Sequence, residues 1–187
     1  MLDRQYRMNQ RIQAFASTEF YDGQLRPATP SVAGRTVDDL EGVSRDALPE
    51  GLQDPVAFVD VPGDEGRYTD SEEATRIAEL IASYEEAGLD RSEIGVIAPF
   101  RAQVSEISTH VPDDVVVDTV DRFQGSSQEV IIVSVTATGT LDGPIFEDYR
   151  RINVAITRPK RALVIVGDPA ALASQPLYRR LLEWARR

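Results

Sequence analysis

Residues 130–135, VIIVSV, form the stretch that decides the fold. The run is apolar apart from one serine, and its residues do not alternate between apolar and polar types. Such a run is typical of a strand that is covered on both faces. A second run of this kind, ALVIV, lies at residues 162–166. The two runs predict the centre of a buried, mostly parallel sheet.

Other strands and helices alternate along the chain on either side of these runs. Strands are expected at residues 56–61 and 94–98, and a short one at 115–117. Helices are expected at residues 9–20, 70–88, 101–110, 150–157 and 176–186. This alternation predicts an α/β fold of three layers, with a mostly parallel sheet and helices on both faces.

The helix expected at residues 70–88 carries the clearest end signals. Asp70 is the expected N-cap, and Glu73 follows three residues later, as in a capping box. Gly88 is expected to end the helix, because glycine accepts the left-handed backbone found after many helices.

Residues 27–55 show no clear period and are rich in Gly, Pro, Asp and Glu. We expect an irregular insertion there, within a single domain that spans residues 1–187. A chain of 187 residues is long enough to bury a proper core, and 42% hydrophobic and 27% charged residues are ordinary globular values.

Composition excludes several kinds of site. The chain has no cysteine and one histidine, His110, so disulfide scaffolds and cysteine-based or histidine-rich metal sites are excluded, and no metal ligand is assigned. His110 is expected to interact with carbonyls at a helix end. No apolar run is long enough to cross a bilayer, and the N-terminus has no signal-peptide core. These features predict a cytoplasmic protein with no membrane partner.

The charge is strongly acidic, with 31 acidic against 20 basic residues and a net charge of −11. Lys160 is the only lysine. Taken alone, this balance argues against a nucleic-acid partner, because phosphates attract cations. An alternative hypothesis is adaptation to a salt-rich cytoplasm, where the Debye length falls to about 3 Å in molar salt and surface repulsion is screened.

Three separated motifs carry a resemblance to a known family, and a fourth segment, IGVIAPFRAQV (residues 94–104), lies between them. The motifs read QYRMNQRIQAFAS with FYDGQL (residues 5–25), DTVDRFQGSSQEVIIVS (118–134) and RRINVAITRPKRALVIVGD (150–168). In this order they resemble the second RecA-like domain of superfamily 1 helicases, in the branch that includes the nonsense-decay and Okazaki-fragment helicases. The resemblance covers nearly the whole chain and is weakest over residues 27–55.

The resemblance implies that Arg7 and Arg158 are the two arginines that point at the γ-phosphate of ATP. A planar guanidinium suits this role because it can hold two phosphate oxygens at once. Two other interpretations stay open from the residues alone. Arg7 can form an ordinary loop salt bridge, and Arg158 can be a cation favoured at a helix C-terminus.

The resemblance also implies a nucleotide pocket. Tyr6 matches the aromatic residue beside the adenine, although a tyrosine buried against the next helix is the alternative. Gly125, after Gln124, lets the backbone come close to a phosphate or ribose. The family usually has a ribose-binding glutamate two positions after this glycine, and Ser127 stands there instead. A serine offers a single hydroxyl, so recognition of the sugar is in doubt. Glu129 is not assigned.

The residues that fall where the family touches a single strand are Pro99, Phe100, Arg101, Gln103 and Thr119. Hydroxyls and arginines suit phosphates, while the ring of Phe100 can stack on a base or fill the core. In parallel sheets, ligands bind beyond the carboxyl ends of strands. We expect Pro99 to Arg101, and the segment from Thr119 to Gly125, to lie there. Asp118 and Asp121 are expected to fix the turn rather than to act as paired carboxylates.

Two parts of an ATPase are not found in the sequence. There is no GxxxxGK[ST] loop, and no apolar strand ends in the Asp-Glu pair that would hold Mg²⁺. In the family these belong to the first RecA-like domain, which would bind most of the ATP and Mg²⁺. We therefore expect this chain to be the C-terminal motor half of an ATP-dependent DNA or RNA helicase, inactive as an ATPase alone. The alternative is a non-catalytic module that binds nucleic acid or protein. A Rossmann enzyme is disfavoured because no GxGxxG follows a strand.

Overall fold

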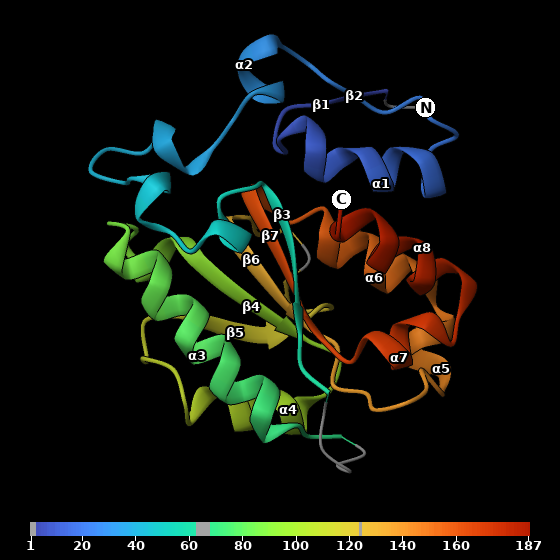
Figure 1. The fold of residues 1–187 in the computed structure, drawn as a ribbon. Coiled ribbons are helices and arrows are strands. Elements are labelled where there is room, and N and C mark those ends of the chain that lie inside the picture. Colours follow the sequence, from blue (N-terminus) through green and yellow to red (C-terminus); the bar gives the residue numbers. More distant parts are fainter. Residues whose placement is uncertain (1–2, 63–67, 124) are drawn as a thin grey trace.

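The computed structural model describes residues 3–62, 68–123 and 125–187. These residues form a five-stranded sheet in the order β3-β7-β6-β4-β5, and every pairing in it is parallel (Figure 1). The strands are β3 (Val56–Asp60), β4 (Ile94–Ala98), β5 (Val116–Thr119), β6 (Gln128–Ser134) and β7 (Pro159–Gly167).

The two apolar runs form neighbouring central strands, β6 and β7. Ile131 and Val133 of β6 point into one core cluster, while Val130 and Ile132 point into the other. Successive side chains of a strand face opposite sides of a sheet. A strand that is covered on both sides therefore needs apolar residues at every position, as residues 130–133 provide.

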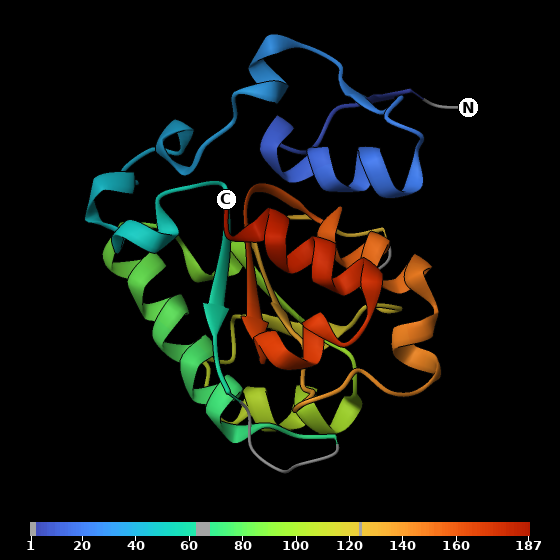
Figure 2. The ribbon, with the colours of Figure 1, turned by 45° about the vertical axis from the view of Figure 1, so that its right-hand side comes forward.

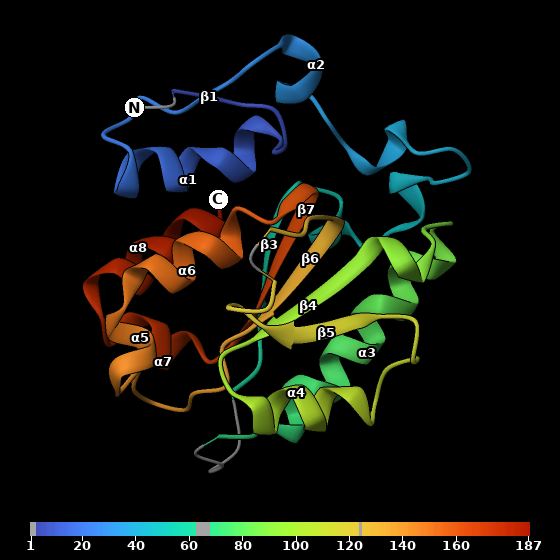
Figure 3. The ribbon, with the colours of Figure 1, turned by 180° about the vertical axis from the view of Figure 1, so that it is seen from behind.

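Helices cover both faces of the sheet, which confirms the three-layer RecA-like α/β fold (Figures 1 and 3). One layer contains α3 (Ser71–Glu86) and α4 (Arg101–Ser108). The other contains α5 (Pro144–Glu147), α6 (Tyr149–Ile156), α7 (Pro169–Ala173) and α8 (Pro176–Ala185). Helix α1 (Gln10–Phe20) joins the same core cluster but lies across the end of this layer (Figure 1). The short α5 and α7 were not expected, because four or five residues are too few to show a helical period.

The main element that differs from expectation in length is β7. It begins at Pro159 rather than at residue 162, and Pro159 pairs with Gln128 of β6. Proline is tolerated at the first position of a strand because no ladder hydrogen bond is required from its nitrogen.

The end signals of α3 are confirmed in part. The Asp70 side chain accepts a hydrogen bond from the backbone N–H of Glu73 at 2.8 Å, and Gly88 has a φ of +101° just after the helix. The capping box is wrong, however, because the N–H of Asp70 donates to Gln103. The Glu73 side chain is instead buried, where it accepts from the Ser134 hydroxyl and the N–H of Thr136.

Residues 27–55 consist of short turns and link the N-terminal elements to β3 (Figure 2). They contain α2 (Pro30–Ala33) and three 3-10 turns at Val37–Asp39, Arg45–Ala47 and Glu50–Leu52. A small parallel pair precedes them, β1 (Arg4–Gln5) with β2 (Arg26–Pro27). Single turns are too short for a periodic pattern, so the sequence could not reveal them. The buried residues that fasten this segment are Val32, Val37, Leu48 and Leu52.

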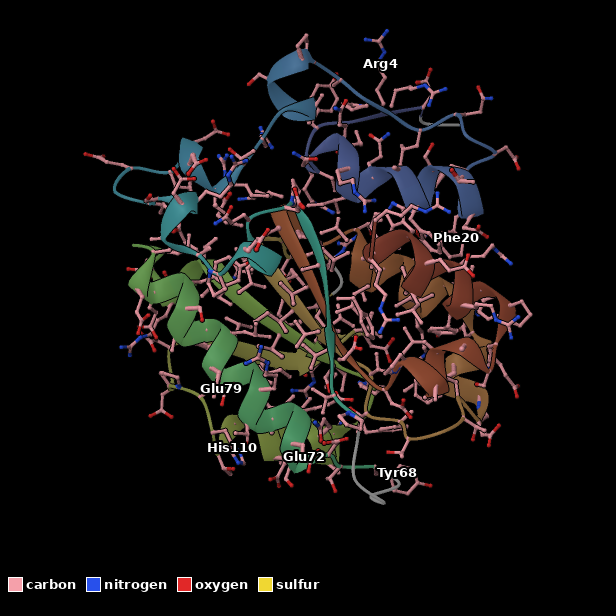
Figure 4. The ribbon with its side chains drawn as sticks, viewed as in Figure 1. Arg4, Phe20, Tyr68, Glu72, Glu79 and His110 are labelled. Atoms are coloured by element: carbon pink, nitrogen blue, oxygen red, sulfur yellow. The ribbon has the colours of Figure 1, made fainter. Side chains whose placement is uncertain are left out.

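The two ends of the sheet lie at opposite ends of the molecule. We call the end where β6 and β7 start the amino edge, and the end where β4, β5 and β6 stop the carboxyl edge. The α1, β1 and β2 elements lie over the amino edge (Figure 1). Arg4 and Tyr68, both labelled in Figure 4, lie at these opposite ends.

Candidate functional site

The turn that carries Arg7 is built around the side chain of Gln5. The Oε1 atom of Gln5 accepts from the backbone N–H groups of Arg7 and Met8, both at 2.7 Å. Its Nε2 atom donates to the Met8 carbonyl at 2.8 Å and to Gln13 Oε1 at 2.9 Å. The turn directs Tyr6 outward, so its side chain is 70% exposed, which excludes the alternative of a tyrosine buried against α1.

Arg7 and Arg158 meet at Thr157, just after the end of α6. Arg7 Nη1 donates to the carbonyl oxygen of Thr157 at 3.0 Å, and Arg158 Nη2 donates to the hydroxyl of the same residue at 3.2 Å. Arg158 Nε also donates to the Val154 carbonyl at 2.9 Å. Two segments 150 residues apart in sequence thus present their guanidinium groups together at the amino edge.

The surroundings of this arginine pair disfavour the charged form of Arg158. Partial burial, and after it the positive charge of Arg7, lowers the pKa of Arg158 from its ordinary value. Among the residues that the structure describes, neither guanidinium forms an ion pair with a carboxylate. The salt-bridge interpretation of Arg7 is therefore not supported. The alternative that Arg158 is a cation at a helix C-terminus agrees with its contact with the carbonyl of Val154, in the last turn of α6.

The turn before β6 approaches the same place. Arg158 Nη1 lies 3.5 Å from the Ser126 carbonyl, next to Gly125 and Ser127. Gly125 is exposed with a φ of +95°, which favours glycine, and Ser127 is half-buried. Gln124 lies outside the described residues. The expectation that Gly125 lies beyond a carboxyl end is wrong: the chain has already crossed to the amino edge there.

Glu129, at the start of β6, is already engaged. Its carboxylate accepts from Lys160 at 2.5 Å and from Arg161 at 2.7 Å. Burial opposes the charge of Glu129, but these two cations outweigh it, and the pKa of Glu129 is lowered. Glu129 therefore does not replace the glutamate that is missing at Ser127.

The carboxyl edge is aromatic. Phe100, which follows β4 and Pro99, is half-buried. Its ring contacts Tyr68 and Phe146 edge-to-face, with centroids 5.1 Å and 6.0 Å away. Arg101 begins α4 and is exposed. Phe100 both packs against the core and presents part of its ring, so the two interpretations of this residue are compatible.

A cleft of about 1270 Å³ opens at this edge. The rings of Tyr68, Phe100 and Phe146 line it, together with the loop from Thr136 to Asp148 and the side chains of Arg150 and Arg151. Thr136 has a φ of +52°, an unusual backbone for a β-branched residue. Sequence reasoning missed Tyr68 and Phe146, because neither lies in a motif.

Thr119 ends β5 and is half-buried. Its N–H donates to Asp118 Oδ1 at 2.7 Å. Asp118 therefore holds the local turn as expected, whereas Asp121 pairs with Arg151 of α6 at 2.8 Å and links the turn to that helix. His110 Nδ1 lies 2.9 Å from the Glu106 carbonyl, which confirms its place among helix-end carbonyls.

Gln103 does not face a strand at the surface, so its predicted role in nucleic-acid binding is wrong. The side chain is fully buried. Its Oε1 accepts from Asp70 N–H at 2.6 Å, and its Nε2 donates to the Asp70 carbonyl at 2.9 Å and to the Ser134 hydroxyl at 3.3 Å. It belongs to a buried polar network with Glu73, whose pKa burial raises to about 8.

Two other features are absent from the residues that the structure describes. No helix there has the length and apolar character needed to span a membrane. In the same residues, no group of three or more metal-binding side chains converges.

The parallel sheet covered on both faces, with two guanidinium groups together at one edge, defines a RecA-like α/β domain. A solved structure, the C-terminal domain of a possible DNA helicase from Lactobacillus plantarum, has the same fold, with a TM-score of 0.56 at 13% identity. The match covers 94% of this chain and 92% of that one.

Several sequence relatives are named helicases. The chain is 33% identical to an uncharacterized ATP-dependent helicase of Methanocaldococcus jannaschii, over 100% of this chain and 29% of that protein. It is 37% identical to the DNA polymerase alpha-associated DNA helicase A of Saccharomyces cerevisiae, over 89% of this chain and 27% of that protein. It is 32% identical to the DNA replication ATP-dependent helicase/nuclease DNA2 of Bos taurus, over 95% of this chain and 19% of that protein. The chain thus spans less than a third of each relative.

A family model described as an AAA domain matches residues 1–170. The chain belongs to this family, as the second RecA-like domain of a superfamily 1 helicase in the nonsense-decay and Okazaki-fragment branch.

Proposed function

We propose that this chain is the C-terminal motor half of an ATP-dependent helicase that moves on single-stranded DNA or RNA. Arg7 and Arg158 act as its arginine fingers, toward ATP held mainly by a first RecA-like domain. The observation that carries the proposal is the meeting of both guanidinium groups at Thr157, at one edge of the fold.

The partners of the two arginines support this role. Their described polar contacts are backbone carbonyls and one hydroxyl, which leaves both positive charges uncompensated. A triphosphate supplies the missing negative charge, and guanidinium groups hold phosphate oxygens with two donors each. An arginine finger contributes about 10³ to 10⁵ in rate, because it stabilises charge that develops on the transferred phosphoryl group.

The rest of the nucleotide pocket lies beside the pair. Tyr6 presents an exposed ring for an adenine, and Gly125 leaves space for close approach of a phosphate or ribose. Ser127 can form one hydrogen bond to a sugar hydroxyl. The Mg²⁺ that accompanies ATP neutralises phosphate charge, and its ligands belong to the first domain.

The strand would lie at the other end of the sheet. Pro99, Phe100, Arg101 and Thr119 provide a ring, a cation and a hydroxyl at the carboxyl edge, beside the aromatic cleft. Opening and closing of the interface between the two RecA-like domains would then shift the strand with each nucleotide cycle. One of these relatives is named a DNA helicase and another a DNA replication helicase/nuclease, which favours DNA.

The experiment compares the longer protein that carries this domain with the 187-residue chain. ATP turnover is measured without a strand, with single-stranded DNA and with single-stranded RNA. We expect strand-stimulated turnover from the longer protein and none from the chain alone. Turnover by the chain alone would contradict the assignment as half of a motor. A longer protein that binds strands but never hydrolyses ATP would instead support the alternative, a non-catalytic module for nucleic acid or protein.

A further inference from the structure

We infer that Arg35, in the segment of short turns at residues 27–55, is a positioning residue that holds the Tyr6–Arg7 turn in place for the nucleotide. The inference rests on the proposed function, because it concerns how Arg7 is presented. The first observation is a pair of hydrogen bonds: Arg35 Nη1 donates to the carbonyl oxygens of Tyr6 at 3.0 Å and of Arg7 at 2.9 Å.

The backbone of Arg35 is fastened to the same turn from the other side. Asn9 Nδ2 donates to the Arg35 carbonyl at 2.5 Å, while the Asn9 side-chain oxygen caps α1. The backbone N–H of Asn9 donates to the Lys160 carbonyl in β7 at 2.9 Å. The buried Asn9 therefore joins the turn to α1, to Arg35 and to β7.

The next residues of the segment are tied directly to β7. Arg161 Nη1 donates to the Thr36 carbonyl at 2.8 Å and to Asp39 Oδ2 at 2.7 Å. Arg161 Nε pairs with Glu129 at 2.7 Å, and its side chain is only 15% exposed. Arg161 lies three positions after Arg158, so the segment that braces Arg7 is anchored on the strand that Arg158 precedes.

The Gln5 side chain bonds the N–H groups of Arg7 and Met8, and Arg35 adds the bonds to the carbonyls of Tyr6 and Arg7. The turn lies between the two-residue strand β1 and the start of α1, and the side chain of Tyr6 is exposed. Fixed carbonyls fix the peptide planes on either side of Arg7, and with them the direction of its side chain. A displacement of about 1 Å in a positioned group can cost about 10²-fold in rate. Arg35 is also half-buried and, among the described residues, has no carboxylate partner in an ion pair.

The test uses the longer protein and the substitution Arg35→Ala, with two measurements. Strand-stimulated ATP turnover should fall by about tenfold or more in kcat, with the KM for the strand unchanged, because the strand lies at the other edge. Without nucleotide, hydrogen exchange of the amides in residues 4–9 should become faster. A matched control is Arg45→Ala in the same segment, since Arg45 contacts Asp38 and not the turn. The control should change neither measurement.

Arg7→Ala in the same assay separates the proposed function, in which Arg7 is an arginine finger, from the inference that Arg35 positions the turn. If Arg7→Ala keeps wild-type turnover, the proposed function fails, while faster exchange in Arg35→Ala would still establish the brace. If Arg7→Ala loses turnover but Arg35→Ala keeps wild-type kcat or wild-type exchange, the inference about Arg35 is overturned. Should Arg35→Ala fail to fold, Arg35→Lys is measured instead. Its shorter reach predicts the same two changes in smaller size, and the absence of either would overturn the inference.

Discussion

The amino edge and the carboxyl edge of this sheet differ in how their charges are balanced. At the amino edge, Arg7 and Arg158 lie together with carbonyls and a hydroxyl for partners. At the carboxyl edge, the arginines beside the cleft are matched: Arg150 with Asp148 at 2.8 Å, and Arg151 with Asp121 at 2.8 Å. Aromatic rings form much of the remaining wall of that cleft.

This difference supports the proposal that the nucleotide lies at the amino edge and the strand at the carboxyl edge. Uncompensated guanidinium groups attract phosphate, and they are held ready by backbone carbonyls rather than by carboxylates that would compete. Aromatic rings beside paired charges suit the faces of bases, which carry no net charge. In a chain with a net charge of −11, Arg7 and Arg158 thus keep their positive charge without a carboxylate partner among the described residues.

The largest effect should come from removing a finger. In the longer protein, Arg158→Ala should lower strand-stimulated kcat by about 10³ or more, because the developing charge on phosphate loses a donor. Arg179→Ala is the matched control, since Arg179 also donates to a backbone carbonyl, that of Ala173, but on α8. Circular dichroism checks that both variants fold. If Arg158→Ala keeps wild-type turnover, the unpaired arginines of the amino edge have no catalytic role that sets this edge apart from the carboxyl edge.

A smaller effect is expected at the carboxyl edge. Phe100→Leu keeps an apolar group against the core but removes the stacking face, so single-strand affinity should fall by about 1–3 kcal/mol per lost stack. Phe100→Tyr keeps the ring and should retain affinity. Fluorescence anisotropy with a labelled single strand measures both. Equal affinity for Phe100→Leu and wild type would mean that Phe100 is only a core residue.

The buried network behind the cleft predicts a pH dependence of stability. Burial raises the pKa of Glu73 to about 8, against an ordinary value of 4.5. Between these pH values the folded chain holds a proton that the unfolded chain releases. The contribution of Glu73 to the free energy of unfolding is therefore fully present below about pH 4.5 and is lost as pH rises to about 8, with a slope of at most about 1.4 kcal/mol per pH unit.

Glu73→Gln isolates this contribution. An amide does not titrate in this range, so the stability of the variant should fall less than that of wild type between pH 5 and pH 8. Urea unfolding at several pH values provides the comparison, and Glu79→Gln on the exposed face of α3 is the control. Parallel pH profiles for Glu73→Gln and wild type would contradict the raised pKa.

The smallest expected effect concerns salt. If the acidic surface is adapted to a salt-rich cytoplasm, the melting temperature should rise by several degrees between low salt and about 1 M KCl, where the Debye length is about 3 Å. Differential scanning fluorimetry measures this change. A chain that is fully stable and monomeric in low salt, with no gain from KCl, would contradict the adaptation.

The sequence predicted the sheet because its central strands are apolar on both faces, as residues 130–133 illustrate. It also predicted the residues that meet at the amino edge, since YRM and AITR are short local motifs. The sequence placed Gly125 at the carboxyl edge because it follows a strand. The sequence does not show that the chain has crossed back to the amino edge before it reaches Gly125.

What the sequence could not reveal are contacts between distant segments. Gln103 sits in a motif but points inward to Asp70 and Ser134. Glu73 has the spacing of a capping residue yet bonds Thr136, which is 63 residues away. Arg35 lies in a stretch with no period, and its role is visible only from its contacts with the Tyr6–Arg7 turn. Side-chain direction, rather than residue type, decides these roles.

We propose that Arg7 and Arg158 stabilise the transferring phosphoryl group. The most direct measurement is the affinity of the longer protein for ADP alone and for ADP with aluminium fluoride, which imitates the transition state. Arg7→Ala and Arg158→Ala should each weaken the aluminium fluoride complex by about 10² or more while changing ADP affinity little. Equal losses for both ligands, or no loss for either, would contradict the claim.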